Sequence, residues 1–411
     1  MKLLLSFLFL LLAVRCLSAD VTAYRIGRGT LEEGSEQAIL KLEGTPYKIG
    51  LQHGTLLKDK IQCYVKQWIE SGKLEDNPRF KMCQEKLPKL LLHLPPHYME
   101  EMKGIAVGSG LPFEKIFMLN LLPDMFHCMG LTVQGESTTD NALYHGHVFD
   151  DQALKGFEPH AILMIVKKEG KCGFVSIGYP GLVGSVVGMN DEKISVSEVE
   201  GDGSGEWEGI PMPFLIREIL ENARSLEEAK TLLEGFPRTS EYCYVLADGN
   251  REKVLGAYAT AHQLCWIEPG VGYALMNSQK LAKNGRGHAS NDKLFMGHFS
   301  SVHSEFQSRF YDDEGELVAL FNQQPKHCLI LKGFQQFEHY SMVAEHVRGV
   351  YGKLNVNHLQ EMVKHLAYDA PLRSVILHPA TSKLWVSHVK KGEEPAVVSY
   401  TLFDLKTLLT M

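Results

Sequence analysis

The spacing of the apolar residues changes partway along the chain. Before residue 128 it is mostly helical, at 47–70, 86–107 and 112–122. In the first of these ranges an apolar residue returns every three or four positions, as on one face of a helix. A short strand at 38–43 precedes that helix. The first part of the chain is therefore predicted to be largely helical.

Beyond residue 128 the apolar residues follow the pattern of strands. Short runs rich in β-branched and aromatic residues alternate with turns of glycine, asparagine or aspartate. These runs are 129–133, 142–148, 161–166, 173–177, 194–199, 242–246, 254–258, 272–276, 374–379, 383–389 and 396–403. Helical patterns interrupt them at 213–237, 306–322 and 356–367. The order predicts one α+β unit, with two layers of sheet covered by helices.

The first 19 residues are typical of a secretory signal peptide. Basic Lys2 precedes an apolar run at 3–14, and the small residues Ser18 and Ala19 come just before Asp20. The run is shorter than the roughly 20 residues of a spanning helix. We therefore predict an exported protein, periplasmic or secreted, with no membrane span.

The net charge and the cysteine residues limit the partners and cofactors that are expected. The formal net charge of −7 disfavours nucleic acid and anionic membrane surfaces as partners. Seven of the eight cysteines follow the signal, and none has zinc-ribbon or CxxC spacing, so neither a metal site nor a cofactor is predicted. An odd number leaves at least one thiol outside disulfides. We assign this role to Cys128, while disulfides among the other six stay open.

Cys128 is the candidate nucleophile because it opens a predicted β-hairpin. A turn of small polar residues follows at 135–141, and the return strand ends at Asp150. Cleavage of the bond between His127 and Cys128 would give one residue both a thiol and a free α-amine. That amine has a pKa of about 8, close enough to a thiol's to accept its proton. The alternative is a buried cysteine that acts as a small apolar residue.

Several motifs around Cys128 resemble the acyl-coenzyme A:6-aminopenicillanic acid acyltransferase family of autoproteolytic cysteine N-terminal nucleophile hydrolases. GTPYKIGLQHG, at 44–54, resembles the family's prosegment. Residues 146–150 match the place of a G-[RQ]-N-x-D pattern, and 181–198 resemble a glycine-rich turn with its following strand. The resemblance implies a four-layer αββα sandwich of two antiparallel sheets flanked by helices. It also implies a helical small chain at 20–127 and a catalytic large chain at 128–411, which stay associated after self-cleavage.

The same resemblance implies an activity. The Cys128 thiol would attack the carbonyl of His127 to cleave the chain, and would then form an acyl-enzyme with a small-molecule amide or ester. Transfer of the acyl group to water gives hydrolysis, and transfer to an amine gives an acyltransferase. The sequence leaves both outcomes open, together with the identity of the substrate.

Three residues depart from the family's pattern. Met129 follows the cysteine where the family usually has serine or threonine, His147 replaces arginine or glutamine, and Val148 replaces asparagine. We expect these positions to set the substrate preference.

Three polar residues are further catalytic candidates. Asp150 could accept a hydrogen bond from the α-ammonium or orient a substrate amine, or it could be a turn aspartate. His147 could bind substrate, or it could be a polar residue satisfied on a strand face. Asn277 could donate to an oxyanion, or it could end a strand as a turn residue.

Three charged residues are candidates for substrate binding. Arg238 and Glu241 could form a buried ion pair that lines the pocket, or Arg238 could simply follow a helix end. Glu198, with Glu200, could bind a cationic group of the substrate, or both could lie on the solvated face of an edge strand.

Two rival functions remain. A metal-dependent hydrolase could use His145 and His147, which share a strand face near His127 and Asp150. Alternatively, the departures at 129, 147 and 148 would suit a secreted binding protein that has lost its chemistry.

Overall fold

The structure is a computed structural model. It describes residues 22–34, 37–75, 77–125, 128–149, 161–200, 207–270, 325–332, 337–366, 373–388 and 399–410. The predicted signal peptide, the strand at 272–276 and the helix at 306–322 lie outside these residues. Among the helices that are described, none has the length and apolar character needed to cross a bilayer.

Two sheets form the centre of the protein. The larger runs in spatial order through β1 (Thr22–Ile26), β2 (Gly29–Glu33), β3 (Ala38–Gly44), β6 (Ile162–Lys168), β7 (Phe174–Gly178), β8 (Val187–Asn190), β9 (Ile194–Glu200), β10 (Tyr242–Asp248), β11 (Lys253–Ala259) and β12 (Leu264–Ile267). The smaller runs through β13 (Cys328–Lys332), β4 (Cys128–Val133), β5 (Tyr144–Phe149), β14 (Arg373–His378), β15 (Lys383–His388) and β16 (Ser399–Asp404). Neighbouring strands are antiparallel, except that β3 and β6 are parallel.

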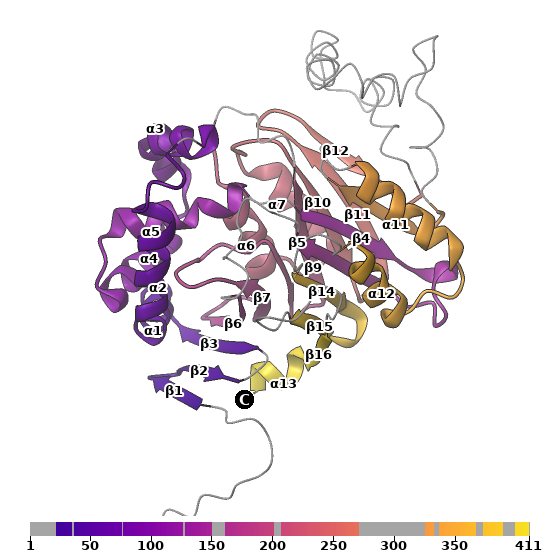
Figure 1. Cartoon of the computed structure of the whole chain (residues 1–411), viewed down its shortest axis with the longest axis horizontal. Coiled ribbons are helices and arrows are strands. Elements are labelled where there is room, and N and C mark those ends of the chain that lie inside the picture. Colours follow the sequence, from indigo (N-terminus) through magenta and orange to yellow (C-terminus); the bar gives the residue numbers. More distant parts are fainter. Residues whose placement is uncertain are drawn as a thin grey trace, which may run out of the picture.

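Helices cover the outer faces of both sheets. Strand β4 packs against β9 and β10, so the two sheets face each other. On the far side of the larger sheet, α6 (Met212–Asn222) and α7 (Leu226–Gly235) contact β8, β9 and β10. On the far side of the smaller sheet, α11 (Phe337–Gly349) and α12 (Val356–Leu366) contact β13, β5 and β14 (Figure 1). The predicted four-layer αββα sandwich is confirmed.

After β3, the segment up to residue 125 is mostly helical, as predicted. It contains α1 (Pro46–Leu56), α2 (Lys58–Tyr64), a π-helical turn (Val65–Ile69), α3 (Pro78–His93), α4 (Pro96–Ser109) and α5 (Phe113–Asn120). Helices α1 and α4 touch through their backbones. A Cβ on Gly50 would lie 1.8 Å from the Glu101 carbonyl oxygen, and one on Gly104 would lie 2.4 Å from the Tyr47 carbonyl oxygen. Glycine is therefore required at both positions of this crossing.

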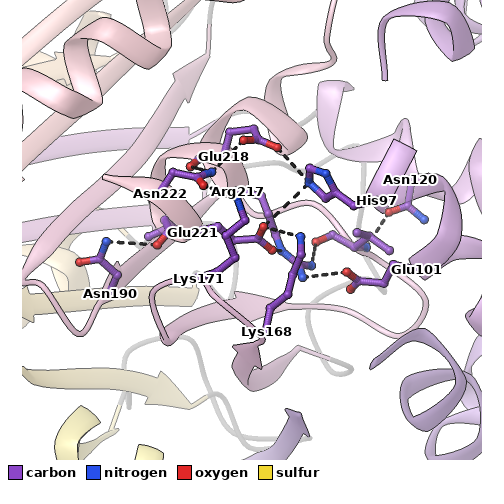
Figure 2. Close-up of polar contacts among 12 residues, drawn as sticks. His97, Glu101, Asn120, Lys168, Lys171, Asn190, Arg217, Glu218, Glu221 and Asn222 are labelled. Carbon is purple, nitrogen blue, oxygen red and sulfur yellow. Dashed lines mark hydrogen bonds and ion pairs between the residues drawn. The ribbon is translucent and has the colours of Figure 1, made fainter. Parts of the chain in front are cut away.

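A buried network of charged residues joins this helical segment to the rest of the protein (Figure 2). Arg217 of α6 lies at its centre and donates to Glu101 of α4 and to Glu221 of its own helix, both at 2.9 Å. Lys168 of β6 donates to the other oxygen of Glu221 at 2.5 Å. Burial opposes the charge of Arg217, but Glu101 and Glu221 outweigh it and raise the guanidinium pKa. The network thus links α4, β6 and α6 through buried charged groups.

A histidine makes a second contact across the same junction. His53 of α1 is fully buried, and its Nε2 accepts a hydrogen bond of 2.9 Å from the backbone N–H of Gly181. Burial, assisted by the nearby charge of Arg217, lowers the pKa of His53 to about 3. The imidazole is therefore neutral at neutral pH, which leaves Nε2 able to accept.

We expect His53 to make the protein less stable as the pH falls below 6.5. Between pH 6.5 and 3 the unfolded chain binds a proton at this histidine and the folded chain does not, so stability falls as the pH falls through this window. The loss is about 2 kcal/mol between pH 6.5 and 5. In urea unfolding at pH 7 and 5, His53→Gln should show a smaller drop than the natural chain. Equal drops would contradict the assignment.

Candidate active site

Cys128 is the first residue of β4 and is 1 % exposed. Strand β4 pairs with β5 in antiparallel register, with Cys128 opposite Phe149 and Gly130 opposite His147. This confirms the predicted hairpin. Cys128, Gly130 and His147 share one face of the smaller sheet. That face points toward the larger sheet, because a Cβ on Gly130 would lie 2.8 Å from a side-chain carbon of Val199.

Three side chains meet between the sheets, and we call Cys128, His147 and Glu198 the Cys–His–Glu cluster. Their sulfur, ring nitrogen and carboxylate oxygen atoms all lie within 4.8 Å of one another. Nε2 of His147 is 3.8 Å from Oε1 of Glu198, and both side chains are fully buried. Phe149 packs edge-on against the imidazole, with ring centroids 4.6 Å apart. A thiol, an imidazole and a carboxylate are thus arranged in a buried site.

The position of Glu198 removes one alternative for this residue. Its strand, β9, lies between β8 and β10 in the larger sheet, so it is not an edge strand. The fully buried carboxylate is not on a solvated face either. The side chain of Glu200 lies outside the described residues. The sequence placed Glu198 near the active site but gave no sign of its contact with His147.

His145 lies beside the cluster but is held by other contacts. Its Nδ1 and Nε2 are each 2.8 Å from a serine hydroxyl, those of Ser195 and Ser197. Burial lowers the pKa of this imidazole to about 3, so it stays neutral. A metal bound by His145 and His147 would displace one of these hydrogen bonds. The structure therefore disfavours the alternative function of a metal-dependent hydrolase that uses both His145 and His147.

Two of the three departures from the family's pattern lie away from the cluster. Met129 and Val148 are paired across β4 and β5. Strand alternation turns both side chains to the opposite face from Cys128. They belong to an apolar cluster with Val343 of α11 and Leu359 of α12. Only His147 of the three departures lies at the candidate site, so the expectation that all three positions set substrate preference is not supported.

Arg238 and Glu241 make contacts that stabilise the fold. The guanidinium of Arg238 donates to the backbone carbonyl of Leu233 near the end of α7 and to that of Thr260, each at 2.8 Å. Glu241 accepts a hydrogen bond of 2.8 Å from the hydroxyl of Tyr258. These contacts favour the alternative in which Arg238 serves the helix end. The roles of both residues in substrate binding stay predictions.

Three predicted site residues, His127, Asp150 and Asn277, lie outside the described residues. Their roles in cleavage, amine binding and oxyanion stabilisation stay predictions. Cys63, Cys172 and Cys328 are thiols and are not joined in disulfides. The thiols of Cys172 and Cys328 have pKa values raised to about 11 and about 12, chiefly by burial. Neither has the environment of an activated nucleophile.

Comparison with known proteins relates the chain to a described family. The model of the family described as acyl-coenzyme A:6-aminopenicillanic acid acyl-transferase matches residues 137–339. The segment 137–339, just under half of the chain, matches this family. The matched segment includes His147 and Glu198 but begins after Cys128. The choice of nucleophile therefore depends on the geometry of the cluster.

Individual relatives match over stretches of similar length. Protein dcd1A of Dictyostelium discoideum is 26 % identical over 240 residues, which is 49 % of this chain and 53 % of that protein. Mouse acid ceramidase is 27 % identical over 208 residues, 43 % of this chain and 50 % of that protein. The chain spans about half the length of the curated relatives it matches. Among solved structures, a conjugated bile acid hydrolase from Clostridium perfringens has a TM-score of 0.42 and 11 % identity, covering 68 % of this chain and 93 % of its own.

Proposed function

We propose that this protein is an exported, self-cleaving cysteine hydrolase or acyltransferase that acts on small-molecule amides through an acyl-enzyme at Cys128. The observation that carries the proposal is the Cys–His–Glu cluster, which places a thiol beside an imidazole and a carboxylate in a buried site. The match of residues 137–339 to an acyltransferase family supports acyl chemistry. The name of one relative, acid ceramidase, points to substrates in which a fatty acyl group is joined to an amine.

Two groups of this chain can accept the proton of the Cys128 thiol. One is the α-amine that appears when the bond from His127 is cut. The other is the imidazole of His147. Glu198, at 3.8 Å, would orient this ring and stabilise the charge it gains. The imidazole is in place before any cleavage, so it can also activate the thiol for the cleavage step itself.

The reaction follows from these positions. Sγ of Cys128 forms a bond to the carbonyl carbon of the substrate while its proton passes to the base. The carbon–nitrogen bond then breaks, and the base returns the proton to the departing amine. Water, or an acceptor amine, next attacks the thioester and releases the thiol. The first acceptor gives hydrolysis and the second gives acyl transfer.

The fold suits a chain that is cut and stays together. Self-cleavage would begin with attack of the Cys128 thiol on the carbonyl carbon of His127, which moves the acyl group from nitrogen to sulfur before water releases it. The two fragments would remain joined by the buried network around Arg217 and by the contact of His53 with Gly181. Helix α4 supplies Glu101 to this network from one fragment, and α6 supplies Arg217 from the other.

Mass spectrometry of the purified chain, incubated with an N-acyl amide, tests the proposal. We expect a fragment whose first residue is Cys128, and an acyl group bound to that residue as a thioester. An intact chain that still gains the acyl group would remove self-cleavage and keep the nucleophile. An intact chain with no adduct would support the alternative of a secreted binding protein that has lost its chemistry.

A further inference from the structure

We propose that the Cys–His–Glu cluster is also a zinc site, in which Zn²⁺ binds Sγ of Cys128, a ring nitrogen of His147 and a carboxylate oxygen of Glu198. Sulfur, imidazole nitrogen and carboxylate oxygen are the three ligand types that zinc uses in proteins. Among the residues that the structure describes, this is the only group of three such side chains that meets within 4.8 Å.

The distances between the ligand atoms fit a zinc ion. Zinc bonds of about 2.0–2.3 Å in tetrahedral geometry place neighbouring ligand atoms about 3.3–3.8 Å apart. Nitrogen and oxygen ligands belong at the short end of this range, so Nε2 of His147 and Oε1 of Glu198, which are 3.8 Å apart, would move slightly closer to bind the ion. The whole cluster lies within 4.8 Å, so small side-chain rotations bring the sulfur into position. The three ligands come from β4, β5 and β9, which are held by hydrogen bonds in two facing sheets.

The charge of the cluster also favours a divalent cation. Cys128, His147 and Glu198 are at most 1 % exposed. A thiolate ligand and a carboxylate that lie close together in a buried site are costly without a counter-charge. Zn²⁺ neutralises both. The neighbouring His145 does not compete, because Ser195 and Ser197 hold its two ring nitrogens.

The proposed zinc site depends on His147, which departs from the family's pattern. The family's pattern has arginine or glutamine at this position, and neither side chain is a good zinc ligand. Three protein ligands leave the fourth coordination position to water, as in zinc sites that are not closed. A thiol bound to zinc cannot attack a carbonyl carbon, so zinc would reversibly inhibit the enzyme. The inhibition rests on the proposed role of Cys128 as nucleophile, whereas the binding does not.

Cobalt is a suitable probe, because Co²⁺ takes zinc sites and absorbs light when bound to a thiolate. The full chain is reduced, stripped of metal and titrated with Co²⁺, which is then displaced with Zn²⁺. We expect one thiolate-to-cobalt absorption per chain, lost on addition of zinc. His147→Gln and Glu198→Gln should each weaken binding at least about tenfold. The exposed Cys63 serves as control, since Cys63→Ala should leave the titration unchanged.

A second measurement does not require that the variants at His147 and Glu198 fold. X-ray absorption of the zinc-loaded Cys63→Ala chain should show one sulfur at about 2.3 Å, with nitrogen and oxygen at about 2.0–2.2 Å. A shell without sulfur, a shell with two sulfurs, or no stoichiometric binding would overturn the proposal. Zinc binding by a chain that forms no acyl adduct would retain the site and remove the proposed function. An acyl adduct on a chain that binds no zinc would retain the proposed function and remove the zinc site.

Discussion

Replacing Cys128 with alanine is expected to lower kcat/KM for an N-acyl amide by at least about a thousandfold, since the variant has no atom that can form the acyl-enzyme. Self-cleavage should be lost as well, because the same sulfur starts it. The measurement is the rate of amine release, together with the mass of the purified chain. Removing one sulfur atom from a buried strand leaves the fold in place, which the urea midpoint can verify.

Cys63→Ala is the matched control for this experiment. Cys63 is exposed on α2, whereas Cys128 lies between the sheets. The control should retain the activity and the cleavage of the natural chain. If Cys128→Ala kept activity within tenfold of that control, the nucleophile assignment would be wrong, and the acyl chemistry would have to come from another group.

The sequence marked all three residues of the Cys–His–Glu cluster as candidates, but it did not predict the contact between His147 and Glu198. Cys128 and His147 could be placed on one face, because a hairpin with period two brings residues from adjacent strands together. Glu198 comes from β9, in the opposite sheet, 51 positions after His147 in the printed sequence. Its contact with His147 depends on how the two sheets are packed. No local pattern carries that information.

The fold was predicted where the apolar pattern is strong. Strand β1 has the sequence TAYRI and is largely exposed, so no buried face marks it. Strand β8 has four residues, VGMN, which is too short for a period to show. The predicted helix at 86–107 is two helices, because Pro95 and Pro96 interrupt the backbone between α3 and α4. Tertiary pairing therefore decided the elements that local sequence left weak.

The predicted ion pair of Arg238 and Glu241 shows a second limit of prediction from sequence. Two opposite charges close together in sequence suggest a pair, but carbonyl groups at a helix end compete for the same guanidinium. In the structure, Arg238 donates to the carbonyl of Leu233 at the end of α7. A prediction based only on closeness in the sequence does not take these backbone acceptors into account.

Arg217→Met is expected to lower the free energy of unfolding by about 3–5 kcal/mol. Methionine has a similar length, so the change removes the charge more than the volume. Glu101 then loses its 2.9 Å partner while it remains fully buried, and Glu221 loses Arg217 but keeps Lys168 and the imidazole of His97 at 3.9 Å (Figure 2). A buried carboxylate without its partner is far costlier than the pair was favourable. Urea unfolding at pH 7 measures the loss.

Two further variants separate the lost charge from lost packing. Adding Glu101→Gln to Arg217→Met removes the stranded carboxylate, so the double variant should be more stable than Arg217→Met alone. Arg224→Met is the surface control. Arg224 pairs with Glu192 at 3.6 Å, with both side chains exposed, and its loss should cost less than about 1 kcal/mol. If Arg217→Met were no more damaging than Arg224→Met, the network around Arg217 would not be what holds the two predicted fragments together.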